Sequence, residues 1–88
     1  MSVTNSDISA VFDHVADLLE YQGGNVFRVR AYRNAAHTIS GMVESLASVR
    51  SDPARKLTEI EGIGAELAGK IETLLATGQL PMLDDLKA

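Results

Sequence analysis

Apolar side chains recur three or four positions apart along this sequence, and no other feature restricts its fold as much. The first run consists of Ile8, Val11, Phe12, Val15, Leu18 and Leu19. Because an α-helix takes 3.6 residues per turn, this spacing puts the whole run on one face of a helix. No segment alternates apolar and polar residues as a half-buried β-strand does. We therefore expect an all-α fold of four or five short helices without a long linker.

Capping residues and glycines predict where the first helices begin and end. One of residues 4–6 (Thr, Asn, Ser) can cap the first helix, and Gln22-Gly23-Gly24 stops it. Asn25 can cap a second helix, which Gly41 weakens or ends. Residues 43–49 can add a short turn of their own. The expected apolar stripe of the second helix consists of Phe27, Ala31, Ala35, Thr38, Ile39 and Met42.

Two further helices and a last turn follow in the second half. Asp52 is a good N-cap and Pro53 a good first residue for a helix from Ala54 to about Ile60. Another helix is expected from Ala65 to about Ala76, and Gly78 suits the left-handed position that ends it. The last amphipathic turn would carry Leu80, Leu83 and Leu86.

The composition bounds the class of protein. The 88 residues, 45% of them hydrophobic and 23% charged, suffice for one globular domain over residues 1–88. The absence of cysteine excludes disulfides and thiolate chemistry, and two histidines make a poor zinc site. No apolar run is long enough for a signal peptide or a membrane span. We expect a cytoplasmic protein, associated with the nucleoid if it binds DNA, with no membrane partner and no required cofactor.

The charges are unevenly distributed. Twelve acidic against eight basic residues give a net charge of −4, which argues against indiscriminate binding to a polyanion. Six of the eight basic residues nevertheless fall in two short segments, one with Arg28, Arg30 and Arg33 and the other with Arg50, Arg55 and Lys56. A local basic face on an acidic domain is therefore compatible with the sequence.

The most informative segment is the Gly62-Ile63-Gly64 turn between two helical stretches. So tight a connection requires unusual backbone angles, and a side chain at either glycine would block a phosphate. Ile63 would plug the core, and the backbone N–H groups of Ile63, Gly64 and Ala65 would point outward at a helix N-terminus, which favours an anion. This pattern, over residues 54–76, resembles a helix-hairpin-helix motif, which binds nucleic-acid backbone without reading bases. The alternative is a structural corner between helices that uses two glycines.

Two flanking segments extend the resemblance. Residues 26–36 (VFRVRAYRNAA) and 77–83 (TGQLPML) lie on either side of the glycine turn at the spacing found in X-family DNA polymerases. Over residues 5–86 the chain resembles the N-terminal helix-hairpin-helix domain of these enzymes, called the lyase domain in the polymerase-β type. The resemblance implies a domain that grips the 5′-phosphate side of a DNA gap during base-excision repair. The polymerase catalytic domain has no counterpart here.

The resemblance also implies a candidate catalytic lysine. In the lyase domains a lysine after the hairpin forms a Schiff base with the abasic sugar, and Lys70 is the matching position. Glu66 precedes Lys70 by one helical turn, and such a pair would keep the amine protonated. We therefore favour an ordinary surface ion pair over lyase activity at this position.

Other positions of the family's basic pocket match only in part. Arg28, Tyr32 and Lys70 still match and are candidate DNA-binding residues. The remaining basic positions are occupied here by Thr58, Glu66 and Met82. Glu61 stands where a proline is common before the first glycine, and Glu61 and Glu66 would both flank an incoming phosphate. We expect weak affinity for DNA as a consequence.

The arginines near the second cap have two interpretations. Arg28, Arg30 and Arg33 could contact a second phosphate beside the hairpin while Tyr32 stacks on a sugar or base. Alternatively, the arginines of this segment pair with the acidic first helix, and Tyr32 belongs partly to the core. The acidic candidates for such pairing are Asp13, Asp17 and Glu20.

The family resemblance further implies a monovalent cation, Na⁺ or K⁺, held by the backbone carbonyls of Thr58, Ile60 and Ile63 and bridging to a DNA phosphate. Three functions remain open at this point. The first is a sequence-independent module for gapped or 5′-phosphorylated DNA, with a polymerase or another repair protein as a candidate partner. The second is a weak lyase acting through Lys70. The third is a protein-interaction module that has lost DNA binding and uses the apolar strip Leu80, Met82, Leu83 and Leu86.

Overall fold

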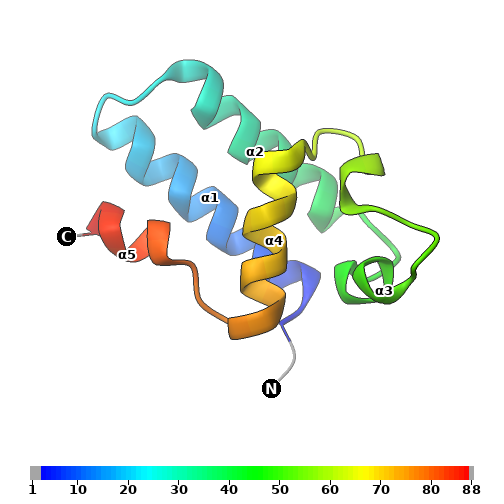
Figure 1. Cartoon of the computed structure of the whole chain (residues 1–88). Helices are drawn as coiled ribbons and strands as arrows, with labels where there is room; N and C mark the ends of the chain where they lie inside the picture. Colours follow the sequence, from blue (N-terminus) through cyan, green and yellow to red (C-terminus); the bar gives the residue numbers. More distant parts are fainter. Residues whose placement is uncertain (1–2, 88) are drawn as a thin grey trace.

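The computed structural model describes residues 3–87, which form five α-helices and one short 3-10 helix, with no strand among them (Figure 1). The elements are α1 (Asn5–Tyr21), α2 (Val26–Ser40), α3 (Leu46–Ser51), η1 (Leu57–Glu59), α4 (Ala65–Thr77) and α5 (Pro81–Lys87). The expected all-α class is confirmed. Within this part of the chain, no helix is both long enough and apolar enough to cross a membrane.

Side-chain caps begin the first two helices where the sequence places them. Thr4 caps α1 by accepting a hydrogen bond from the Asp7 N–H at 3.1 Å, and the Asp7 carboxylate accepts from the Thr4 N–H at 2.9 Å. These hydrogen bonds with Thr4 lower the pKa of Asp7. Asn25 caps α2 by accepting from the N–H of Phe27 at 2.7 Å. Local hydrogen bonding therefore accounts for both helix starts.

Small side chains bring α1 and α2 together as a long side-by-side pair (Figure 1). Ala16, Ala35 and Ala36 are buried between them, and the Ser9 hydroxyl donates to the Ala36 carbonyl at 2.8 Å. This bond satisfies a buried hydroxyl that would otherwise destabilise the core. Beside this contact the rings of Phe12 and Tyr32 meet edge to face, with centroids 5.4 Å apart.

The buried stripe of α2 differs from the one expected. Phe27 is 77% exposed and Ala31 is exposed as well, whereas the core positions of the helix are Val29, Tyr32, Ala35, Ala36 and Ile39. Two residues correspond to about 200° around a helix axis. Phe27 and Ala31, each two positions from Val29, therefore face away from α1.

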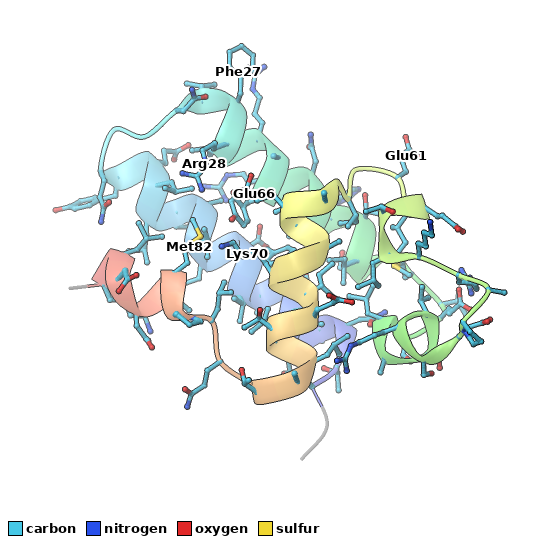
Figure 2. The ribbon with its side chains drawn as sticks, viewed as in Figure 1. Phe27, Arg28, Glu61, Glu66, Lys70 and Met82 are labelled. Carbon is cyan, nitrogen blue, oxygen red and sulfur yellow. The ribbon has the colours of Figure 1, made fainter. Side chains whose placement is uncertain are left out.

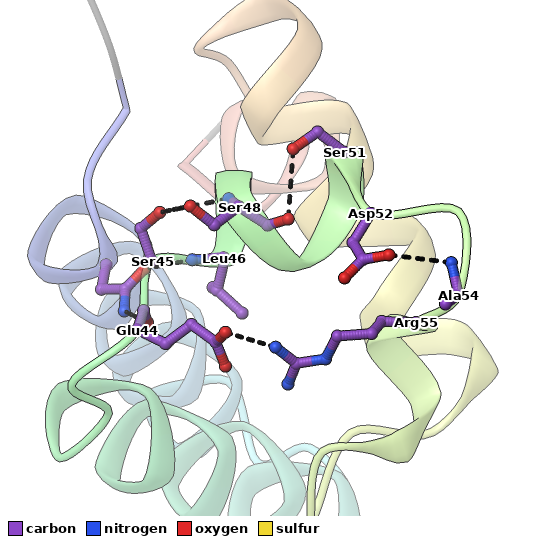
Figure 3. Close-up of polar contacts among 9 residues, drawn as sticks. Glu44, Ser45, Leu46, Ser48, Ser51, Asp52, Ala54 and Arg55 are labelled. Atoms are coloured by element: carbon purple, nitrogen blue, oxygen red, sulfur yellow. Dashed lines mark hydrogen bonds and ion pairs between the residues drawn. The ribbon is translucent and has the colours of Figure 1, made fainter.

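The prediction of a helix from Ala54 to Ile60 is wrong. Asp52 ends α3, and its carboxylate accepts a hydrogen bond from the Ala54 N–H at 2.9 Å (Figure 3). A side chain that bonds two residues ahead stabilises a turn in competition with a helix. Only η1 follows, so the first arm of the hairpin is a single 3-10 turn.

The second half of the chain covers the α1–α2 pair. Helix α4 crosses the pair in Figure 1 and buries Leu67, Ile71 and Leu74, and Gly78 ends it at φ 75° as expected. Helix α5 packs on α1, where the Gln22 side chain donates to the Leu86 carbonyl at 2.8 Å. The apolar strip of α5 therefore helps to close the domain's own core: Leu80 is buried, and Met82, Leu83 and Leu86 are partly buried against it.

The close approach of α1 and α2 predicts a sharp dependence on side-chain size. We expect Ala36→Leu to lower the free energy of unfolding by about 1–3 kcal/mol, because the larger side chain has no room between the helices. Ala31→Leu makes the same change on the exposed side of α2 and should change stability by less than about 0.5 kcal/mol. Urea denaturation of both variants measures the difference, and equal effects would contradict the proposed close contact.

Candidate nucleic-acid interface

The turn between η1 and α4 is shaped by two glycines with different roles. Gly62 has φ 81°, a left-handed conformation that side chains disfavour. Gly64, in contrast, has φ −83° and ψ −178°, an extended backbone that any residue adopts. Ile63 between them is 3% exposed and anchors the turn in the core. The unusual backbone angle expected of this tight turn is therefore that of Gly62.

The N-terminus of α4 presents free backbone donors. No backbone acceptor within residues 3–87 receives the N–H groups of Gly64, Ala65 and Glu66, and the first bond of the helix runs from Ala68 N–H to Gly64 C=O at 2.9 Å. A Cβ added at Gly64 would meet no atom within 4 Å, so the approach to these donors is open. An anion could reach them without displacing a side chain at Gly64.

One expected donor is unavailable. The N–H of Ile63 donates to the carbonyl of Ile60 at 3.0 Å, which closes the turn. Since this bond uses the only backbone proton of Ile63, the residue cannot also donate to a phosphate in this conformation. Ile63 therefore contributes to the interface by anchoring the turn.

Helix α4 and helix α2 are joined by an ion pair beside these donors. The Arg28 guanidinium lies 3.3 Å from the Glu66 carboxylate, and both side chains are about half exposed (Figure 2). The expected pair between Glu66 and Lys70 is absent from the part of the chain that the structure describes, because Glu66 turns toward α2 instead. Sequence reasoning missed this contact, since its partners are 38 residues apart and only tertiary packing brings them together.

Lys70 lies one turn along α4 from Glu66, partly buried, and no ion pair to it occurs within residues 3–87. In Figure 2 its side chain extends from α4 on the side where Met82 lies on α5, whereas Glu61 projects from the hairpin turn. The residue therefore lies on the α2–α5 side of the hairpin, as does the Arg28–Glu66 pair.

Tyr32 is part of the core rather than of the surface. Its side chain is 1% exposed, and its hydroxyl donates to the sulfur of Met82 at 3.2 Å. Burial raises the pKa of the Tyr32 hydroxyl, and the charge of Glu66 adds to the rise. A ring in this position has no face free for a sugar or base, so the stacking role expected for Tyr32 does not fit the structure.

Arg33 is held by the acidic first helix. Its guanidinium lies 2.7 Å from Asp17, 3.8 Å from Glu20 and 4.0 Å from Asp13. The hydrogen bond to Asp17 raises the pKa of Arg33 above its ordinary value. Of the two interpretations of Arg33, the structure supports pairing with the acidic residues of α1. Arg33 could contact a phosphate only if these ion pairs were broken. Arg30 is exposed, and no ion pair of residues 3–87 includes it.

The carbonyls expected to hold a cation lie along the turn. Thr58 is in η1, and Ile60 and Ile63 follow it before α4 begins. The Ile60 carbonyl accepts the Ile63 N–H, and no backbone bond to the other two carbonyls occurs within the described residues. No cluster of three His, Asp or Glu side chains suited to a metal occurs in residues 3–87, so any cation here would depend on backbone oxygens.

The two glycines should respond oppositely to the same substitution. We expect Gly62→Ser to lower the free energy of unfolding by about 1–2 kcal/mol, because serine disfavours φ 81°. Gly64→Ser should leave stability unchanged or raise it by a few tenths of a kcal/mol, since serine is a good N-cap at an extended position. Urea denaturation checks both, and an equal loss in the two variants would contradict the assigned roles.

Comparison with known sequences agrees with this geometry. The sequence model of one family, the helix-hairpin-helix domain, matches residues 3–80. No curated protein matches the chain. The match covers most of the chain, including the glycine turn, the start of α4 and the helices that support them. The chain therefore belongs to the helix-hairpin-helix domain family.

Proposed function

We propose that this domain binds DNA through its sugar-phosphate backbone, without regard to base sequence, at gapped or 5′-phosphorylated sites during base-excision repair. Membership of the helix-hairpin-helix family supports sequence-independent DNA binding in general. The observation that carries the proposal is the α4 N-terminus, where three free N–H groups lie behind the open position at Gly64. The repair role rests on the resemblance to the lyase-type domains of X-family polymerases.

The chemistry of the α4 N-terminus suits a phosphate and not a base. Backbone N–H groups and the positive end of the helix dipole attract any phosphate oxygen equally well, whichever base the nucleotide carries. No side chain extends from Gly64 to contact a base edge. The resemblance to the X-family polymerases makes a polymerase or another repair protein the candidate partner for this role.

The proposed cation fits the same contact. Three backbone carbonyls, those of Thr58, Ile60 and Ile63, are hard oxygen ligands of the kind that Na⁺ and K⁺ accept. A cation at this point would supply positive charge to a phosphate that approaches α4. It would also offset the repulsion from Glu61, which is exposed on the turn.

DNA binding should depend on salt and on the open position at Gly64. We expect fluorescence anisotropy to show tighter binding to gapped DNA with a 5′-phosphate than to the same gap without one or to intact duplex. Gly64→Glu should abolish this binding, because it places a carboxylate over the donors. Gln79→Glu makes the same charge change beyond the far end of α4 and should bind nearly as the parent does. No binding of the parent protein at low salt would refute the proposal.

The Arg28–Glu66 pair predicts a gain of affinity. Glu66→Gln removes a negative charge at the α4 N-terminus and releases Arg28 for a phosphate, so DNA affinity should rise about two- to fivefold. Asp85→Asn removes the same charge from exposed α5 and should have a smaller effect. Equal changes in the two variants would indicate a general charge effect and contradict a specific role for Glu66.

A weak 5′-deoxyribose-phosphate lyase is the second candidate function. The specific observation in its favour is that Glu66 pairs with Arg28 and not with Lys70, which leaves the Lys70 amine without that carboxylate. Its Nζ could add to the aldehyde of an abasic sugar with loss of water, and borohydride would reduce the resulting imine to a stable adduct.

Trapping with borohydride tests the lyase directly. If the activity exists, Lys70→Ala and Lys70→Arg should both abolish the trapped adduct, since arginine keeps the charge without the nucleophilic amine. Lys87→Ala should leave it intact. Retention of the adduct in the Lys70 variants would assign the chemistry to another amine, and no adduct with the parent protein would leave DNA binding as the function.

A further inference from the structure

A hollow of about 340 Å³ lies beside the hairpin, between α4 and the segment from α3 to η1. It is separate from the side of α4 that carries Glu66 and Lys70 and faces Arg28 of α2, and none of these three residues lines it. The side chains that give it its chemistry are Arg50, Arg55, Lys56, Thr58 and Glu72. Thr58 and Ala65 belong to the hairpin and also line the hollow, so the hollow adjoins the proposed phosphate contact at the N-terminus of α4.

The charge of this lining is positive on a domain that is acidic overall. Arg50 and Lys56 are exposed, and neither has an ion pair among residues 3–87. Arg55 is held by the carboxylate of Glu44, as Figure 3 shows, and so contributes less. Glu72 is the one carboxylate in the lining. Within the lining itself, two unpaired cations against one carboxylate leave an excess of positive charge, while Asp52 and Glu59 act on Arg55 from outside the lining.

The floor of the hollow is made of small residues of α4. Ala65, Ala68 and Gly69 line it, and a Cβ added at Gly69 would meet nothing within 4 Å. Packing therefore does not require a glycine at this position, although a helix interior disfavours it relative to alanine. The absent side chain keeps the surface of α4 open to a bulky group between the two free cations.

We propose that this hollow is a second DNA-backbone site, in which Arg50 and Lys56 hold phosphates of the strand whose neighbouring phosphate is bound at the α4 N-terminus. The inference rests on the proposed DNA binding and extends it. The contact would be made to phosphates alone, because the cations flank an open surface and no aromatic side chain lines it. The strand would leave the hairpin along the side of α4 that faces α3.

The salt dependence of DNA binding tests this site. A plot of log affinity against log salt has a negative slope, and each lost phosphate contact reduces its steepness by about 1 on duplex DNA. Arg50→Gln/Lys56→Gln should therefore make the slope shallower by about 2. The control is Arg30→Gln/Lys87→Gln, which removes the same two residue types elsewhere. Arg30 lines a different hollow on α2, and Lys87 is on α5, across α4 from α3 (Figure 1). In addition, Glu72→Gln should raise affinity more than Asp85→Asn does.

The outcomes separate this inference from the proposed function. A reduced slope in the Arg50/Lys56 variant alone, with a melting temperature near that of the parent, supports the second site. If the parent binds and Gly64→Glu abolishes binding, but the Arg50/Lys56 variant has the same slope as the control, the second site is refuted and the hairpin contact stands. If the parent shows no salt-sensitive binding to DNA, both fail.

Discussion

The contact between α1 and α2 supports everything else in this domain. Small buried residues, Ala16, Ala35 and Ala36, let the helices approach closely, and the bond from Ser9 to the Ala36 carbonyl satisfies the polar group trapped there. Larger side chains at these positions would separate the helices and remove the surface on which α4 packs. The position of α4, and therefore of the donors at its N-terminus, depends on this contact.

The hairpin converts that packing into a binding surface. Ile63 is buried and closes the turn with its own N–H, which leaves the following N–H groups at the start of α4 without internal acceptors. The first arm of the hairpin is only a 3-10 turn, because Asp52 stabilises a turn before it. A short first arm is sufficient here, since the anchor is Ile63 and the donors belong to α4.

Groups that attract a phosphate and groups that repel it lie near one another at this surface. The free donors and the cations Arg50 and Lys56 favour a phosphate, whereas Glu61 and Glu66 oppose it. Arg28 is paired with Glu66, and a phosphate would have to compete with that carboxylate for it. If the domain binds DNA as proposed, this mixture of charges predicts low affinity for a single phosphate, so that several phosphate contacts would act together.

Local interactions explain why much of the fold could be predicted. The helix caps at Thr4 and Asn25, the stop at Gly78 and the glycine turn each involve residues within four positions, so their sequence is sufficient. The prediction of the apolar stripe on α2 was wrong at Phe27 and Ala31. Both residues are apolar but face away from α1, and composition does not show which side of a helix other helices cover.

The candidate site, like the fold, could be predicted only where it depends on residues that are close in sequence. The Gly62–Gly64 turn and the start of α4 follow from local sequence, and the structure contains both. The partners of the charged residues could not be predicted from local sequence. Arg28 pairs with Glu66 and Arg33 with Asp17, which are 38 and 16 residues apart in the sequence. A long charged side chain can reach several partners, and its choice among them depends on how the helices pack. Most helices and their ends thus follow from local sequence, except the predicted helix over residues 54–60, whereas the free cations, the buried Tyr32 and the hollow beside α4 arise from packing.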